Sequence, residues 1–430
     1  MKFFKPLNFP FLFILILFFF GMTGNAQKLL FLGGTAHIGN GEVVTNAAIG
    51  IENGRFLFVE NQMFKRIDTT EFDSVFRLRD VHFYPGFIAP NTTLGLTEID
   101  AVRASRDFKE TGLLNPNMRT IAAYNTDSEI IPTMRSNGVL MAQTTPRGGI
   151  FSGTSSIVNL NGRNREEASF KIDDGVHLNW PERFTQKGWW ANPGSIAKNT
   201  NEEEQIEDII QFLNEAKAYA QNEKANPVNL RFEALRGVFS GKKRLYIHCN
   251  QARSIVKGTS LKRRFDIPHV VIVGGYDAHL IPEVLADNNI PVIYKRPHSL
   301  PSREDDDIHL PYKIPARLMA ANILFCLDMS GGMEAMNQRN LPFVAGTAAA
   351  YGLNKEQALA AVTGNTAKIL GIDEEAGTLE TGKTATFFIS AGDAIDIKTN
   401  QIISAYIKGE LVDLSSRQTR LRDKFRAVYD

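Results

Sequence analysis

The sequence predicts an α/β protein with a parallel sheet in its middle and short strands at both ends. Between residues 85 and 376, apolar strand-like runs alternate with helix-like runs, which is typical of repeated strand–helix units. Residues 27–84 and 377–415 instead contain short apolar runs broken by glycine and asparagine, which indicates β-hairpins. The alternation alone leaves open whether the parallel sheet closes into a barrel or stays an open doubly wound sheet.

The first 26 residues have the order that is typical of a secretory signal peptide. Lys2 and Lys5 precede an apolar run at 11–20, and Gly24-Asn25-Ala26 supplies small residues before Gln27. The run is shorter than the roughly 20 apolar residues of a membrane helix, so an uncleaved anchor is the less favoured alternative. We expect an exported protein, periplasmic or secreted, without stable membrane insertion after cleavage.

Composition gives no sign of a nucleic-acid or lipid partner. The 48 Lys and Arg residues nearly cancel the 47 Asp and Glu residues, which leaves a net charge of +1. The expected partners are a small-molecule substrate or ligand and either a second copy of the chain or a paralogue. The two cysteines, Cys249 and Cys326, lie in apolar runs, so buried free thiols are favoured over a disulfide.

Both ends of the chain are expected to form strands. Strands are predicted at 29–32, 47–52, 55–60, 387–390 and 402–412. Asn53-Gly54 is a strong hairpin signal, and Lys408-Gly409 is expected to turn the last strand pair. Residues 416–430 are expected to form a C-terminal tail.

The middle of the chain supplies the strand–helix units. Strands are predicted at 244–248, 269–273, 291–294 and 322–327, and helices at 202–219, 277–288 and 355–370. The segment 181–199, with Trp180, Trp189 and Trp190, is irregular and aromatic. It is predicted to be either a lid over a site or a packed surface loop.

A motif at the start of the predicted parallel sheet resembles the amidohydrolase superfamily. Residues 84–93, Tyr-Pro-Gly-Phe-Ile-Ala-Pro-Asn-Thr-Thr, are similar to the Pro-Gly-Phe-Ile-Asp-x-His-x-His opening of that superfamily. Further similar segments are 339–343, 363–371 and 377–385, and together they resemble the imidazolonepropionase-related branch. The resemblance implies a closed (β/α)8 TIM-type barrel over 85–376 and a small β-sandwich composed of 27–84 and 377–415.

The resemblance also implies a metal site, in which the two histidines of the first strand are replaced. Asn91 and Thr93 stand at their positions, and Ala89 stands where the superfamily has aspartate. Side chains two residues apart along a strand point to the same face, so both are expected at one site. An amide oxygen and a hydroxyl are weak ligands for zinc or iron, whereas imidazole is a good one.

Two other positions of the superfamily site are retained. His248 ends the strand-five candidate and Asp328 follows the strand-eight candidate, so the resemblance assigns both as catalytic residues and metal ligands. Gly274 or Gly275 replaces the strand-six histidine, and the strand-four residue cannot be assigned. Because a catalytic zinc normally has three protein ligands, a divalent metal, zinc or iron, is expected only if the site is functional. Alternative ligands are His279, His298 and His309.

Arg147 and Arg339 are the charged candidates for substrate binding. Arg147 lies in the glycine- and hydroxyl-rich segment 144–156, which is predicted to be either an anion-binding loop or a turn-rich connection. Arg339 would bind a carboxylate bidentately or form a structural salt bridge. The rest of the predicted substrate-binding set is Asn340, Asn91 and Thr93.

Two functions follow from the resemblance. The first is an exported hydrolase that acts on carbon–nitrogen bonds of linear or cyclic amides, with a rearranged metal site that uses His248 and Asp328. The second is an inactive protein with the same fold that binds a ligand or acts as a scaffold. A barrel fold alone does not decide between them, because function depends on the site.

Overall fold

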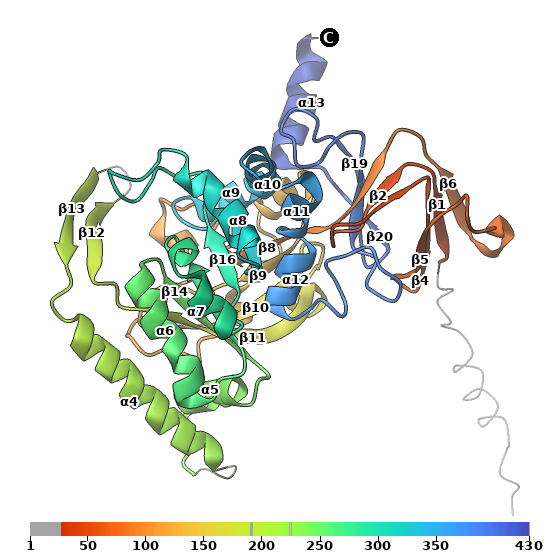
Figure 1. Cartoon of the computed structure of the whole chain (residues 1–430). Coiled ribbons are helices and arrows are strands. Elements are labelled where there is room, and N and C mark those ends of the chain that lie inside the picture. Colours follow the sequence, from red (N-terminus) through yellow and green to blue (C-terminus); the bar gives the residue numbers. More distant parts are fainter. Residues whose placement is uncertain (1–26, 190–191, 223, 225, 430) are drawn as a thin grey trace, which may run out of the picture.

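The computed structural model describes residues 27–189, 192–222, 224 and 226–429 (Figure 1). The predicted signal peptide and Trp190 lie outside these residues. Within the described part of the chain, no helix is both long and apolar enough to cross a membrane.

The two ends of the chain form two sheets beside the rest of the molecule (Figure 1). One sheet has the order β5-β4-β1-β6 and the other β20-β19-β18-β7-β2-β3. Their strands are β1 (Leu29–Leu32), β2 (Thr35–His37), β3 (Val43–Thr45), β4 (Ala47–Glu52), β5 (Arg55–Asn61), β6 (Ser74–Arg77), β7 (His82–Pro85), β18 (Phe387–Ser390), β19 (Ile402–Ile407) and β20 (Glu410–Val412). The strands predicted at 29–32, 47–52 and 387–390 have these bounds.

A shared aromatic core joins the two sheets. Phe31 of β1 is buried, and its ring centroid lies 6.1 Å from that of Phe83 and 5.5 Å from that of Phe387. Phe387 in turn stacks on Tyr406 of β19, with 4.8 Å between the ring centroids. Such contacts bury large apolar surfaces, so strands from both chain ends stabilise one core.

Two hairpin turns pack against each other where these sheets meet. Asn53 and Gly54 have φ of 54° and 71°, as a two-residue turn between twisted strands requires, and Lys408 and Gly409 have φ of 52° and 77°. A Cβ on Gly54 would lie 2.5 Å from the carbonyl oxygen of Lys408. Only glycine fits there, because the turns approach so closely.

The middle of the chain forms a sheet of eight strands in the order β17-β16-β15-β14-β11-β10-β9-β8, and its edge strands β8 and β17 contact each other. The strands are β8 (Phe87–Thr92), β9 (Val139–Thr144), β10 (Phe151–Asn159), β11 (Ser169–Asn179), β14 (Arg244–Cys249), β15 (Val270–Gly274), β16 (Val292–Lys295) and β17 (Phe325–Asp328). The protein is thus a mixed α/β protein with a nearly closed, barrel-like sheet.

Helices surround this sheet (Figure 1). The α-helices are α1 (Thr120–Ala123), α2 (Ile131–Arg135), α3 (Arg165–Ala168), α4 (Glu202–Gln221), α5 (Leu230–Phe239), α6 (Ala252–Phe265), α7 (Pro282–Asp287), α8 (Leu310–Ala320), α9 (Glu334–Asn337), α10 (Leu341–Ala350), α11 (Lys355–Ala360), α12 (Gly364–Leu370) and α13 (Arg417–Tyr429). Short 3-10 helices are η1 (Thr69–Glu71), η2 (Arg103–Ser105), η3 (Ala278–Leu280) and η4 (Gln338–Asn340).

The sheet departs from eight repeated strand–helix units at β10. This strand runs antiparallel to both β9 and β11, while the other neighbouring pairs within the sheet are parallel. Residues 145–150 connect β9 to β10, and only the short helix α3 separates β10 from β11. Residues 152–156, predicted to lie in a loop, therefore lie within a buried strand.

Two further local predictions are wrong. Residues 181–199, expected to be irregular, contain the antiparallel hairpin of β12 (Phe184–Trp189) and β13 (Asn192–Lys198). Residues 355–370, expected to form one helix, form α11 and α12. Thr363, between the two helices, has a non-helical backbone with φ of −134° and ψ of −99°. Gly364 then lies against Gly39, where a Cβ would be 2.4 Å from a carbonyl oxygen.

Apolar side chains close the N-terminal end of the barrel-like sheet. Ala367, Ile369 and Leu370 of α12 share one buried cluster with inward-facing residues of the strands, including Val271 and Cys326. Cys249 is also buried, and both thiols are free, as expected. The polar strand ends of the sheet lie at the opposite end from this cluster.

Candidate functional site

Four polar residues lie at the C-terminal ends of strands in the eight-stranded sheet. Asn91 lies near the end of β8, His248 near the end of β14, Lys295 ends β16 and Asp328 ends β17. Lys295 and Asp328 are direct partners in the parallel register of β16 and β17. In barrel folds, this is the end of the sheet that carries the functional residues.

Asn91, near the end of β8, and Asp328, at the end of β17, are hydrogen-bonded to each other. The amide nitrogen Nδ2 of Asn91 donates to Oδ2 of Asp328 at 2.8 Å and to Oγ of Ser330 at 2.9 Å. Ser330 donates its own Oγ–H to Oδ2 of Asp328 at 2.5 Å and its backbone N–H to Oδ1 at 2.7 Å. Both carboxylate oxygens of Asp328 are therefore occupied by protein donors.

The backbone at Asn91 is not extended. Its φ is 49°, in the left-handed region that asparagine tolerates, and the pairing of β8 with β9 shifts register between Ala89 and Thr92. The prediction that Asn91 and Thr93 project together from one face assumed a regular strand, so its geometric basis is wrong. Thr93 is buried, and its Oγ1 has no hydrogen-bond partner among the described residues.

Arg147 places a guanidinium directly beside Asn91. Its Nη1 donates to Oδ1 of Asn91 at 2.9 Å, and its Nη2 donates to the carbonyl oxygen of Asn91 at 2.7 Å. Nη2 also pairs with Oε1 of Glu334 at 3.0 Å, and both of these side chains are largely buried. Arg147 therefore belongs to the cluster that the sequence predicted, in a positioning role toward Asn91.

A second network continues below this cluster inside the sheet. Oε1 of Gln143 accepts the backbone N–H of Asn91 at 3.0 Å, and its Nε2 donates to Oδ2 of Asp174 at 2.8 Å. Ser155 and Tyr246 donate to the same buried carboxylate, each at 2.7 Å. Burial raises the pKa of Asp174, and these three donors oppose the rise.

His248 is paired with a histidine that the sequence analysis missed. Its Nε2 lies 2.8 Å from Nδ1 of His177 on β11, so one of the two rings donates a hydrogen bond to the other. The ring of His177 also stacks on Tyr246, with 4.6 Å between ring centroids. Burial lowers the pKa of both histidines well below the usual range, which keeps the pair uncharged at neutral pH.

Lys295 differs from its neighbours because its ammonium is unpartnered. Among the described residues, no hydrogen-bond acceptor or carboxylate lies within bonding distance of its Nζ, and solvent reaches the side chain. Surrounding protein nevertheless removes much of its hydration and lowers its pKa, with Arg147 adding a smaller effect of like charge. Burial raises the pKa of Asp328 to about 6, opposed by Ser330, Asn91 and Lys295.

This donor set does not fit the divalent metal that the resemblance implies. In the described part of the chain, no group of three His, Cys, Asp or Glu side chains is arranged to hold a metal ion. Asp328 already accepts from Ser330 and Asn91, and His248 uses Nε2 on His177. A guanidinium also lies beside Asn91, where its positive charge opposes the binding of a cation.

The alternative histidine ligands lie elsewhere. Nδ1 of His279 lies 3.0 Å from the carbonyl oxygen of Tyr276, and Nε2 of His298 lies 2.7 Å from Oγ1 of Thr347. His309 packs its ring on Tyr312 and Tyr351. None of the three joins the cluster around Asp328.

Arg339 and Asn340 lie away from the cluster. The side chain of Asn137, which precedes β9, donates to the carbonyl oxygen of Arg339 at 2.8 Å. Asn137 lies at the N-terminal end of β9, whereas Gln143 lies near the C-terminal end. The structure therefore does not bring Arg339 and Asn340 together with Asp328.

Several members of the cluster were not predicted: Gln143, Asp174, His177, Lys295, Ser330 and Glu334. One of them had a usable signal. Lys295 is the polar residue that ends an apolar strand candidate, as His248 and Asp328 do in theirs. The others lie within runs that have no motif, and their partners come from distant segments.

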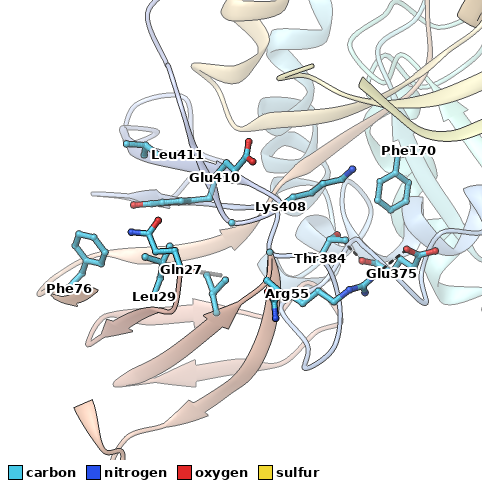
Figure 2. A pocket seen from close by; sticks show the side chains of 15 residues that line it. Gln27, Leu29, Arg55, Phe76, Phe170, Glu375, Thr384, Lys408, Glu410 and Leu411 are labelled. Atoms are coloured by element: carbon cyan, nitrogen blue, oxygen red, sulfur yellow. Dashed lines mark hydrogen bonds and ion pairs between the residues drawn. The ribbon is translucent and has the colours of Figure 1, made fainter. Parts of the chain in front are cut away.

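A separate cavity of about 930 Å³ lies among the chain-end sheets and the start of β11, as Figure 2 shows. Arg55 and Glu375 pair across 3.6 Å on one side of it, and Phe170 lies near them. Its lining contains no predicted site residue. This cavity is therefore distinct from the strand-end cluster.

Comparison with known proteins supports the fold. Residues 315–412 match the sequence model of the amidohydrolase family. The structure is similar to the crystal structure of an amidohydrolase from Thermotoga maritima MSB8, with a TM-score of 0.75 and 22% identity over 90% of this chain and 99% of that one. The chain has an amidohydrolase fold. No curated protein matches it.

Other solved structures with this amidohydrolase fold are less similar. A Xaa-Pro dipeptidase with bound methionine in its active site has a TM-score of 0.54 at 12% identity, over 90% of this chain and 100% of that one. An adenosine deaminase from Xanthomonas campestris with bound zinc has a TM-score of 0.51 at 14% identity, over 93% of this chain and 99% of that one. The relatives thus share the fold, while their named activities differ from one another.

Proposed function

We propose that this chain is an exported binding protein with an amidohydrolase fold, which holds a small carboxylate at the strand-end cluster without a catalytic metal. The observation that supports the proposal most is the contact of Asn91 with Asp328. In this contact, the side chains at two positions that the superfamily uses for metal binding are hydrogen-bonded to each other. The signal-peptide pattern of residues 1–26 supports export.

The charges of the cluster favour an anionic ligand. Asp328 and Glu334 are each satisfied by protein donors, whereas the ammonium of Lys295 has no partner in the described structure. Solvent reaches the side chain of Lys295, so a ligand carboxylate can approach its ammonium and form a charge-assisted hydrogen bond. Arg147 adds positive potential from the same side.

Hydrolysis of carbon–nitrogen bonds is the second candidate. The match of residues 315–412 to the amidohydrolase family and the pKa of about 6 for Asp328 support it, because such a carboxyl exchanges protons near neutral pH. In this hydrolysis Asp328 would be the general base, and His248 would contact the substrate. Against this candidate, both oxygens of Asp328 already accept protein hydrogen bonds.

Ligand binding can be tested by thermal unfolding with a panel of dipeptides, N-acyl amino acids and dicarboxylates. A ligand present at 100 times its Kd should stabilise the protein by about 2.7 kcal/mol. The Lys295→Met variant should lose this stabilisation. The control is Lys398→Met, because Lys398 is an exposed lysine outside the cluster.

The same samples separate the two candidates. The binding proposal expects stabilisation by a carboxylate and no turnover of dipeptides or lactams. Turnover that is lost in Asp328→Asn would instead establish the hydrolase. If no compound in the panel stabilises the wild-type protein more than Lys295→Met, the carboxylate site is wrong.

A further inference from the structure

The C-terminal helix α13 is basic and amphipathic. Its 13 residues carry five basic side chains and one acidic side chain, for a net charge of +4. The whole chain has a net charge of +1, so the average over the sequence conceals this local concentration. Figure 1 shows α13 extending outward from the rest of the molecule.

The beginning of α13 is fixed to the body of the protein. Oγ1 of Thr133 donates to Oε1 of Gln418 at 3.2 Å, and Arg420 pairs with Glu129 at 3.1 Å. Ser416 accepts the backbone N–H of Thr419 at 3.3 Å and thereby caps the helix start. These contacts all involve residues 416–420, at the start of the helix.

An apolar stripe runs along the later turns. Leu421, Phe425 and Val428 follow a spacing of four and then three residues, which places them on one side of a helix. Their side chains are 42%, 54% and 71% exposed, so the exposure increases along the helix. An exposed apolar stripe of this kind indicates a surface that binds a protein or a membrane.

Basic residues flank this stripe. Arg422 and Lys424 occupy positions on its two sides, by helical spacing from Leu421 and Phe425. Lys424 has no ion pair in the described structure, and Arg422 pairs only with its neighbour Asp423. Long basic side chains in these positions can keep their charged ends at a negatively charged surface while the apolar stripe enters the apolar layer beneath that surface.

We propose that α13 docks the protein on an anionic lipid surface. The helix lies in the interface, with Leu421, Phe425 and Val428 in the acyl boundary and the basic side chains at the headgroups. A second copy of the chain is disfavoured as the occupant, because two helices of charge +4 repel each other. This docking surface is independent of the strand-end cluster and of the function proposed for it.

The test is sedimentation of the purified protein with vesicles. The protein should pellet with vesicles of phosphatidylglycerol and phosphatidylcholine and stay in solution with phosphatidylcholine alone. Arg422→Gln together with Lys424→Gln should lower the partition coefficient roughly 30-fold, since each basic residue contributes about 1 kcal/mol near such a surface. The control is Arg263→Gln with Arg264→Gln, which removes equal charge from exposed positions on α6.

The apolar contribution has its own variant. Phe425→Ser should release the protein from anionic vesicles, whereas Leu300→Ser, at a residue that is 79% exposed elsewhere, should not. Circular dichroism checks that each variant is folded. Equal binding to neutral vesicles, no binding to anionic vesicles, or preferential binding to poly-glutamate would each overturn the proposal.

Discussion

Asn91 donates from Nδ2 to Oδ2 of Asp328 across 2.8 Å, and this contact joins the first and last strands of the barrel-like sheet. Both of these side chains are buried. Arg147 completes the arrangement from the other side, since it donates to both the side-chain and backbone oxygens of Asn91. The side chain of Asn91 is therefore hydrogen-bonded to protein groups through both its amide nitrogen and its amide oxygen.

Restoring two histidines should not restore a metal. In the double variant Asn91→His and Thr93→His, the guanidinium of Arg147 and the bonded pair of His177 and His248 still oppose coordination. We expect elemental analysis after zinc dialysis to find less than one equivalent in both wild type and variant. A stoichiometric zinc content in the wild-type protein would show that the cluster rearranges to bind metal.

Removing Arg147 should destabilise the protein. Arg147→Met leaves Glu334 largely buried without its cation and removes two donors to Asn91. We expect a loss of about 2 kcal/mol in urea unfolding, less than the 3–5 of a fully buried pair because solvent reaches Arg147. Arg119→Met is the matched control, because its pair with Asp173 is more exposed and should cost less than about 1 kcal/mol.

Asp328 should make the stability decrease as pH rises from about 4 to 6. Its pKa is raised from 3.8 to about 6 in the folded protein, so between these values the folded state binds more protons than the unfolded state. Its favourable contribution is present below 3.8 and is lost as pH rises through 6, which amounts to about 3 kcal/mol.

The difference between wild type and Asp328→Asn isolates this effect. Unfolding free energies measured in urea at pH 4 and pH 7 should change differently in the two proteins, because the amide does not titrate. If wild type and Asp328→Asn differ in unfolding free energy by the same amount at pH 4 and pH 7, the pKa of the Asp328 carboxyl is not raised in the folded state.

The parts of this structure that the sequence predicted are those specified locally. The strand at 29–32 and the hairpin turn at Asn53-Gly54 follow from short apolar runs and turn residues. His248 and Asp328 were assigned by the resemblance, and both lie at or near the ends of buried strands. Each of these predictions needs only a few neighbouring residues.

The cluster itself depends on contacts between distant segments. Asn91 is 237 residues from Asp328 and 56 from Arg147 in the sequence. The antiparallel direction of β10 likewise depends on its pairing with β9 and β11, because its apolar pattern is the same in either direction. Local pattern therefore predicted which residues end strands, but not what they bind.

The pair of His177 and His248 should make stability fall in acid. Burial lowers the pKa of both rings well below 6.5, so below pH 6.5 the unfolded chain binds protons that the folded chain does not. His177→Phe keeps an aromatic ring against Tyr246 but removes one titrating group. The variant should lose less stability than wild type between pH 6.5 and 5 in urea unfolding. A parallel loss in both proteins would mean that His177 has the same pKa in the folded and unfolded states. His269→Phe serves as the control, because this exposed histidine lies outside the pair and also has a lowered pKa.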